Sequence, residues 1–114
     1  MSDCIFCQIA AGDIAADLVY QDEQVVAFRD ITPQAPTHIL IIPRRHIGTL
    51  LETDEETVPL LGRMQHAAVE IARREGLDQR GFRLVTNCLE EAGQSVFHLH
   101  LHLLGGRRLG WPPG

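Results

Sequence analysis

The chain has 114 residues, 45% of them hydrophobic, which predicts one globular domain over residues 1–114. Its formal net charge of −5 argues against a general nucleic-acid-binding surface, so we expect no nucleic-acid partner. No apolar run approaches the roughly 20 residues that cross a bilayer, and the N-terminus has neither the basic nor the apolar region of a secretion signal. We therefore expect a cytoplasmic protein that does not associate with membranes.

The first half of the chain predicts one short helix and three strands. Apolar residues at helical spacing indicate a helix over 5–12. Two β-rich runs, 18–20 and 25–28, are joined by a polar turn and predict a hairpin. A proline-bounded loop at 32–36 leads to the apolar run 39–42, which fits a strand buried on both faces.

The second half predicts one long helix and two further strands. Thr53 and Glu56 form a potential capping box for a helix that extends to about Glu75. Strands are expected at 82–87 and 98–103. The apolar stripe of the long helix comprises Val58, Leu61, Met64, Ala68, Ile71 and Ala72. Because strands and helices do not alternate regularly, we predict an α+β fold, in which the long helix packs on an antiparallel sheet.

The cysteines favour metal binding over a disulfide framework. There are three, Cys4, Cys7 and Cys88, and an odd number in a cytoplasmic chain argues against structural disulfides. The Cys4-x-x-Cys7 pair suits half of a zinc site or a redox pair. Since no strand precedes it, as a thioredoxin-like motif would require, zinc is the better interpretation. Zinc then needs two more ligands.

Three histidines, His98, His100 and His102, alternate with leucines near the C-terminus. On a strand, their side chains share one face, with neighbours roughly 6.6 Å apart. The row spans roughly 13 Å, too far for all three to reach one metal ion at about 2.0–2.1 Å. The three imidazoles must therefore have different roles.

A short polar motif, Gly93-Gln94-Ser95, precedes the histidine row. Its backbone N–H groups and the Ser95 hydroxyl would suit phosphate oxygens. A phosphate site beside a neutral imidazole favours nucleophilic attack on phosphorus. Taken alone, however, these three residues are better explained as an ordinary turn.

The alternation of His98, His100 and His102 with apolar residues resembles the pattern that defines the histidine triad (HIT) family. Segments 28–38, 41–43 and 93–96 and the C-terminal Trp111-Pro-Pro-Gly also resemble its Hint-type branch of purine nucleoside phosphoramidases. The resemblance implies one HIT domain and a hydrolase acting on phosphorus–nitrogen bonds. Its substrates would be purine nucleoside 5′-phosphoramidates such as adenosine 5′-phosphoramidate.

The resemblance also implies a role for each matching residue. His100 would be the nucleophile, forming a nucleotidyl-histidine that water hydrolyses to the nucleoside monophosphate. His102 would contact the phosphate or leaving group, Ser95 would bind phosphate oxygens, and His38 would support the histidine cluster. Asp30 would accept hydrogen bonds from both ribose hydroxyls. The remaining nucleotide-binding residues would be Phe6, Ile9, Phe28, Ile31, Asn87, Gly93, Gln94 and Trp111.

Several of these residues have simpler explanations when taken one by one. Asp30 on its own fits a cap of the following proline loop. Phe6, Ile9 and Phe28 fit a hydrophobic core, and Asn87 fits a turn. Only the family resemblance favours a nucleotide site for them.

Bacterial zinc-binding members of the family supply an expected metal site. By resemblance to them, Cys4, Cys7, His46 and His98 would bind one structural zinc per chain, a closed set of two thiolates and two imidazoles. It would join the N-terminal helix to the sheet. The alternative is that the two cysteines bind no metal and His46 is a surface residue.

Two other functions remain open. One is hydrolysis of dinucleoside polyphosphates, the activity of the Fhit-like branch, although the Trp111-Pro-Pro-Gly tail favours the Hint branch. The other is a nucleotide-binding or interaction module with incidental catalysis. The resemblance further implies a homodimer, with the long helix and a strand edge at the interface.

Overall fold

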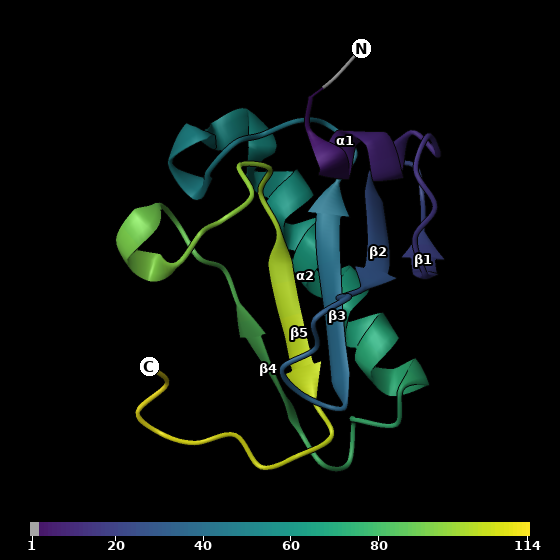
Figure 1. Ribbon diagram of the computed structural model, residues 1–114, viewed down its shortest axis with the longest axis vertical. Coiled ribbons are helices and arrows are strands. Elements are labelled where there is room, and N and C mark those ends of the chain that lie inside the picture. The colour runs from purple at the N-terminus through teal and green to yellow at the C-terminus, as the bar shows by residue number, and fades with distance from the viewer. Residues whose placement is uncertain (1–2) are drawn as a thin grey trace.

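A computed structural model describes residues 3–114 and contains a five-stranded antiparallel sheet (Figure 1), which confirms the predicted α+β class. The strand order is β1-β2-β3-β5-β4. The strands are β1 (Leu18–Gln21), β2 (Val25–Arg29), β3 (Thr37–Pro43), β4 (Phe82–Val85) and β5 (Leu101–Gly105). None of the helices in the described part of the chain is both long and apolar enough to span a bilayer.

One face of the sheet packs against the long helix α2 (Val58–Arg74), which lies behind the sheet in Figure 1. Alternate residues of the central strands point into this core, because side chains on a strand alternate between faces. Ile39 and Ile41 of β3 and Leu103 of β5 are fully buried there. This core is the main source of apolar burial and fixes α2 on the sheet.

The capping box lies one residue later than predicted and caps the 3-10 turn Glu55–Thr57, which leads directly into α2. The side chain of Asp54, not that of Thr53, accepts a hydrogen bond from the Thr57 amide (3.1 Å), and the Thr57 hydroxyl accepts one from the Asp54 amide (2.8 Å). The predicted box of Thr53 and Glu56 is therefore wrong. The Thr53 hydroxyl donates instead to the Leu50 carbonyl (2.7 Å), which closes the preceding 3-10 turn.

The buried stripe of α2 also differs in part. Met64, Ala68, Ile71 and Ala72 are buried as predicted, but Val58 is 52% exposed. Leu60 and Ala67 are buried in addition, and Leu61 is partly buried. Two residues correspond to about 200° around a helix, so Val58 points away from the side on which Leu60 meets the core.

The opposite face of the sheet is covered at one end by the short helix α1 (Ile5–Ala10). Phe6 and Ile9 of α1 pack on Phe28 and Leu40, which lie on β2 and β3. The rings of Phe6 and Phe28 meet edge to face with centroids 5.4 Å apart. Because α1 is only six residues long, this packing, rather than helix propensity, stabilises it.

The histidine row begins in a bend at His98 and enters β5, which starts at Leu101. Ladder pairing thus begins three residues later than the predicted 98–103. The predicted alternation nevertheless holds: Leu99 and Leu101 are buried in the core beneath α2, whereas His100 and His102 line the opposite face. Strand β4 ends at Val85, so Asn87 follows it instead of belonging to it.

Candidate functional site

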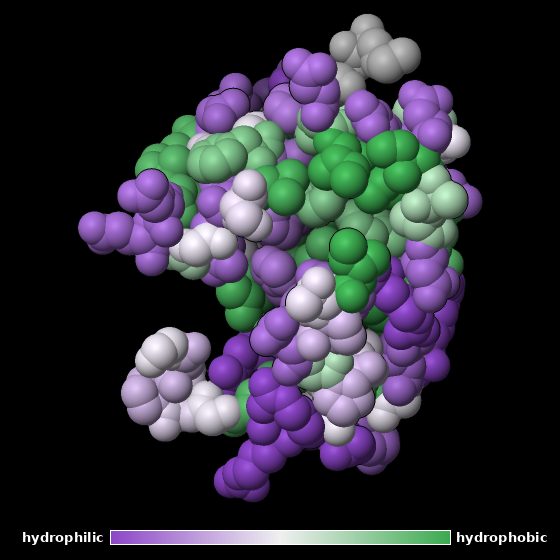
Figure 2. All heavy atoms as spheres, in the orientation of Figure 1, coloured by the Kyte–Doolittle hydropathy of each residue, from purple (hydrophilic) through white to green (hydrophobic). Residues whose placement is uncertain are grey.

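The α1 face of the sheet holds a cavity of about 770 Å³. Figure 2 shows this face, with apolar side chains gathered near α1 and the surface hollowed beside them. Phe6 and Ile9 of α1 and Phe28 of β2 form apolar walls, and the imidazoles of His38, His100 and His102 lie at the polar end. Such an apolar pocket with a few polar groups is typical of a small-molecule site.

The ring of His100 is fixed by the backbone. Its Nδ1 donates to the carbonyl oxygen of His98 at 2.7 Å, so in the neutral ring Nε2 carries the unshared electron pair. The side chain is buried, and the Phe6 ring meets it edge-on with centroids 5.2 Å apart. This imidazole is therefore held in one orientation in the cavity wall, an arrangement that suits a base or a nucleophile.

A second pair of histidines forms a directed hydrogen-bond chain. The Gln34 amide donates to His38 Nδ1 at 3.0 Å, so the proton of the neutral His38 ring is on Nε2. That nitrogen lies 2.9 Å from His102 Nδ1 and donates to it. The remaining proton of His102 is then on Nε2, and this ring serves as a hydrogen-bond donor in the cavity.

The electrostatic surroundings keep both rings neutral. Burial lowers the pKa of His102, and the neighbouring His100 and His38 lower it further, to about 4, although Asp30 opposes the shift. Burial likewise lowers the pKa of His38, again opposed by Asp30. Neutral imidazoles are what the hydrogen-bond chain requires.

Asp30 caps the following loop and also lines the cavity. Its Oδ1 accepts from the Thr32 amide at 2.8 Å, which is the loop cap suggested by sequence. Its Oδ2 lies 3.5 Å from His38 Nε2, and the residue lines the cavity. Asp30, His38 and His102 also have the spacing of a metal site. However, the Gln34 amide fixes a proton on His38 Nε2, which argues against metal binding there.

The other predicted nucleotide-binding residues fall into two groups. Those that line the cavity are Phe6, Ile9, Phe28, Ile31, Gly93 and Ser95, with Ile31 98% exposed at its rim. Asn87, Gln94 and Trp111 do not line it. Trp111 is 82% exposed, with its ring 6.0 Å from the Arg83 guanidinium, and Gln94 is buried beneath the loop.

Further cavity residues were not predicted. Leu40 lies two positions after His38 on β3, so strand alternation would have placed it on the same face. Val96 directly follows the Gly-Gln-Ser motif. Gln34 contributes its backbone amide, which any non-proline residue could supply, so no side-chain pattern reveals it.

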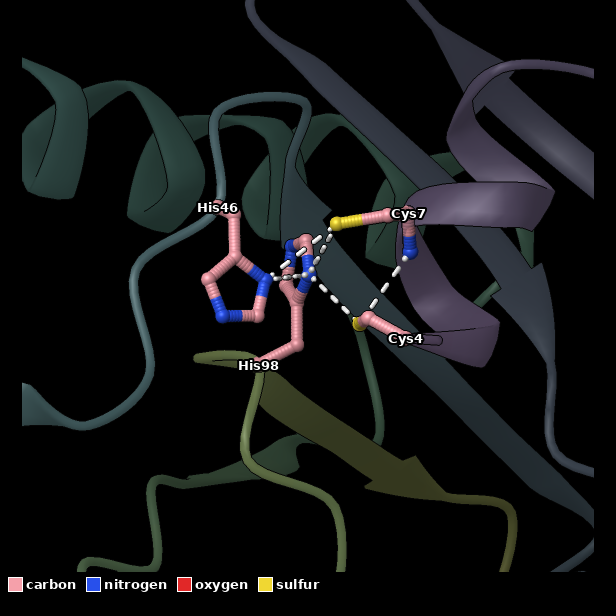
Figure 3. Close-up of side chains that lie close together, drawn as sticks. All are labelled: Cys4, Cys7, His46 and His98. Atoms are coloured by element: carbon pink, nitrogen blue, oxygen red, sulfur yellow. Dashed lines mark hydrogen bonds between the residues drawn. The ribbon is translucent and has the colours of Figure 1, made fainter. Parts of the chain in front are cut away.

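A separate cluster lies where the start of α1 meets the end of the sheet (Figure 3). It consists of Cys4, Cys7, His46 and His98, whose donor atoms all lie within 4.8 Å of one another. His98 Nδ1 lies 3.3 Å from the Cys4 sulfur, 3.4 Å from the Cys7 sulfur and 3.2 Å from His46 Nδ1. The Cys7 sulfur and His46 Nδ1 are 3.2 Å apart.

The donor geometry fits a tetrahedral metal ion. Zinc distances near 2.3 Å to sulfur and 2.0–2.1 Å to nitrogen place tetrahedral nitrogen–nitrogen and sulfur–nitrogen pairs about 3.3–3.6 Å apart and the two sulfurs about 3.8 Å apart. In addition, His98 Nε2 donates to the Pro43 carbonyl at 2.8 Å, which leaves Nδ1 to face the cluster. A backbone partner for the second ring nitrogen is typical of metal-binding histidines.

Comparison with known proteins agrees with this architecture. Residues 11–109 match the HIT domain. The chain is 51% identical over 108 residues to the purine nucleoside phosphoramidase of Escherichia coli, covering 95% of this chain and 91% of that protein. It is 47% identical over 114 residues to a 14 kDa zinc-binding protein of Brassica juncea, covering 98% and 100%.

A solved structure gives the same result. The HIT family hydrolase of Legionella pneumophila superimposes with a TM-score of 0.97 at 50% identity, covering 98% of this chain and all of that one (100%). The domain match and these identities show that the chain belongs to the HIT family.

Proposed function

We propose that this protein is a hydrolase that cleaves the phosphorus–nitrogen bond of purine nucleoside 5′-phosphoramidates. The observation that carries the proposal is the fixed orientation of His100, whose Nδ1 is bonded to the His98 carbonyl and whose side chain lines a nucleotide-sized cavity. The E. coli relative carries the name of this activity. In this proposal His100 is the nucleophile, His102 is the hydrogen-bond donor and His38 is the supporting ring.

The reaction has two displacement steps. His100 Nε2 attacks the α-phosphorus and the phosphorus–nitrogen bond breaks, its electron pair leaving with the amine. Solvent supplies the proton that the leaving amine takes up, His102 Nε2 donates a hydrogen bond to the leaving nitrogen, and Ser95 with the adjacent backbone binds the phosphate oxygens. Water then attacks the phosphorus of the nucleotidyl-histidine, the bond to His100 Nε2 breaks with its electron pair returning to the ring, and the proton lost by the water goes to solvent. The products are the nucleoside monophosphate and neutral His100.

The rest of the cavity binds the nucleoside. Phe6, Ile9 and Phe28 enclose the base between apolar surfaces, and Ile31 covers it at the rim. Asp30 accepts hydrogen bonds from the ribose hydroxyls while its Oδ1 retains the Thr32 amide. Each carboxylate oxygen has two acceptor sites, so the cap and the ribose contacts are compatible.

Replacement of the nucleophile tests the proposal. We expect His100→Asn to reduce turnover of adenosine 5′-phosphoramidate by at least about 10³-fold, because no other imidazole in the cavity has the same fixed orientation. His66→Asn is the matched control, since His66 lies on α2 with its side chain 61% exposed. Steady-state release of adenosine monophosphate measures both, and near-normal turnover by His100→Asn would refute the assignment.

A substrate comparison separates the two hydrolase branches. The wild-type protein should turn over adenosine 5′-phosphoramidate with a higher kcat/KM than diadenosine polyphosphates. A preference for the dinucleotide would place the activity with the Fhit-like branch. Tight binding of adenosine monophosphate without turnover of either substrate would identify a binding module.

We further propose that Cys4, Cys7, His46 and His98 hold one structural zinc ion per chain. The four donor atoms lie within 4.8 Å of one another, and the B. juncea relative is named a zinc-binding protein. When bound, zinc supplies a rigid cross-link between α1 and the sheet and takes no part in the phosphoryl chemistry. Because His98 also provides the carbonyl that fixes His100, this cross-link supports the nucleophile.

Metal content and stability test the zinc site. Protein purified without chelators should contain close to one zinc per chain, and Cys7→Ser should contain less than about 0.1. Cys88→Ser is the matched control, because Cys88 is outside the cluster and should leave the metal content unchanged. A wild-type protein without zinc whose thermal stability ignores EDTA would contradict the proposal.

We also propose a cytoplasmic homodimer. Trp111 is a large apolar side chain that is 82% exposed and lies outside the cavity, which suits contact with a second copy. Light scattering should give twice the chain mass, and a monomer at micromolar concentration would rule the dimer out.

A further inference from the structure

Gln94 lies between two residues that line the cavity, yet its own side chain points the other way. Gly93 and Ser95 contribute to the wall, whereas Gln94 is only 6% exposed and does not. Gly93 and Ser95 therefore face the cavity, whereas the Gln94 side chain is buried behind them. The Gln94 side chain has no assigned part in the reaction described above.

The buried amide of Gln94 holds the loop at three points. Its Oε1 accepts from the Leu89 amide at 2.9 Å. Its Nε2 donates to the Gly48 carbonyl at 2.9 Å and to the Val96 carbonyl at 3.1 Å. Both amide hydrogens are used, so this side chain joins the two ends of the loop to each other and to the segment that follows β3.

Leu89 has a strained backbone, and Gln94 holds it in place. Its backbone has φ 71° and ψ −176°, a conformation that costs energy for any residue with a Cβ atom. The Leu89 amide donates to the Gln94 side chain, and the Leu89 carbonyl accepts from the Gln94 amide at 3.1 Å. Gln94 thus bonds both backbone groups of the strained residue, which otherwise would relax and move the loop.

We propose that Gln94 is a positioning residue, which holds the Leu89–Val96 loop so that Ser95 and its neighbouring backbone face the phosphate of the bound nucleotide. This inference rests on the proposed function, because it assigns the phosphate to Ser95. Gln94 touches no substrate. It acts only through the loop. The apolar walls around the base are formed chiefly by Phe6 and Ile9 of α1 and Phe28 of β2, and Val96 of the loop packs against them.

A pair of ligands that differ only in phosphate isolates this role. Gln94→Met keeps the side-chain length and removes all three hydrogen bonds. We expect its Kd for adenosine monophosphate to rise about tenfold or more, because a displaced loop loses its phosphate contacts. Its Kd for adenosine should stay within about twofold. Calorimetry measures both, and Gln65→Met, exposed on α2, is the matched control.

The outcomes separate the two proposals. If the wild-type protein binds neither ligand and hydrolyses no phosphoramidate, the proposed function fails. If the wild-type protein is active but Gln94→Met weakens both ligands equally, or neither, the positioning role of Gln94 is wrong.

Folding of the variant is controlled independently. Gln94→Asn keeps an amide but is one methylene shorter, so it should show the same selective loss for adenosine monophosphate with a smaller effect on thermal stability. In the wild-type protein, hydrogen exchange of the Leu89 amide should already be slow before nucleotide is added. Rapid exchange there would show that Gln94 does not fix the loop, whatever the variants do.

Discussion

Two of the histidine rings in the cavity take their orientation from a backbone group, and the third, His102, takes its orientation from the His38 ring. His38 receives the Gln34 amide, and His100 donates to the carbonyl of His98. These partners decide which nitrogen of each ring carries the proton. At the scale of single residues, the proposed mechanism depends on tautomers that the fold imposes.

The low pKa of His102 predicts how stability depends on pH. Its pKa is about 4 in the folded protein, set by burial and by His100 and His38, with Asp30 opposing, against an ordinary value of 6.5. Between those values the unfolded chain binds more protons, so the free energy of unfolding should fall as the pH decreases from 6.5 to 4. Above pH 6.5 this group should have no effect.

His102→Gln removes that titration and retains an acceptor for His38. Urea unfolding of both proteins at matched pH values should therefore show a smaller loss of stability for the variant between pH 6.5 and 4. The remaining titrating groups are common to both proteins and cancel in the comparison. Parallel curves would contradict the assigned environment of His102.

At the scale of the elements, α2 contains a glycine that its structure does not need. A Cβ atom added at Gly62 would meet nothing within 4 Å. Gly62→Ala should therefore raise the free energy of unfolding by roughly 0.5–1 kcal/mol, because alanine loses less backbone freedom in a helix. Since α2 lies on the face opposite the cavity, kcat/KM should not change.

Gly76 provides the contrasting control for this prediction. It follows α2 with φ +75°, where alanine is strained although space is available. Gly76→Ala should lower the stability measured in the same denaturation experiment. If both substitutions changed the free energy of unfolding equally, helix propensity would not explain the effect of Gly62→Ala on α2.

The sequence predicted the elements better than their connections. Periodicity located both helices and the central strands because apolar spacing reflects local backbone geometry. The capping box was displaced by one residue because Thr53 bonds to the preceding turn, a contact that competes with the cap. For the site, the family resemblance indicated His100 and Ser95, but the inward direction of Gln94 depends on Gly48, which is 46 residues away.

At the scale of the whole molecule, the two faces of the sheet carry different features. The α2 face carries the larger apolar core, and the α1 face carries the cavity, the histidines and the cysteine–histidine cluster. Side chains that alternate along β3 and β5 serve the two faces in turn. This division explains how leucines and histidines can share one segment of chain without conflict.

The short helix α1 belongs to both sites on its face, since Cys4 and Cys7 flank the cavity-lining Phe6. Two ligands that order one helix must help each other by the same factor. Bound adenosine monophosphate should thus lower the Kd for zinc, and loss of zinc should raise the Kd for the nucleotide by the same factor. Equilibrium competition with a zinc-binding dye, with and without nucleotide, measures the first change, and calorimetry with and without zinc measures the second. An unchanged Kd for zinc would show that α1 does not couple the two sites.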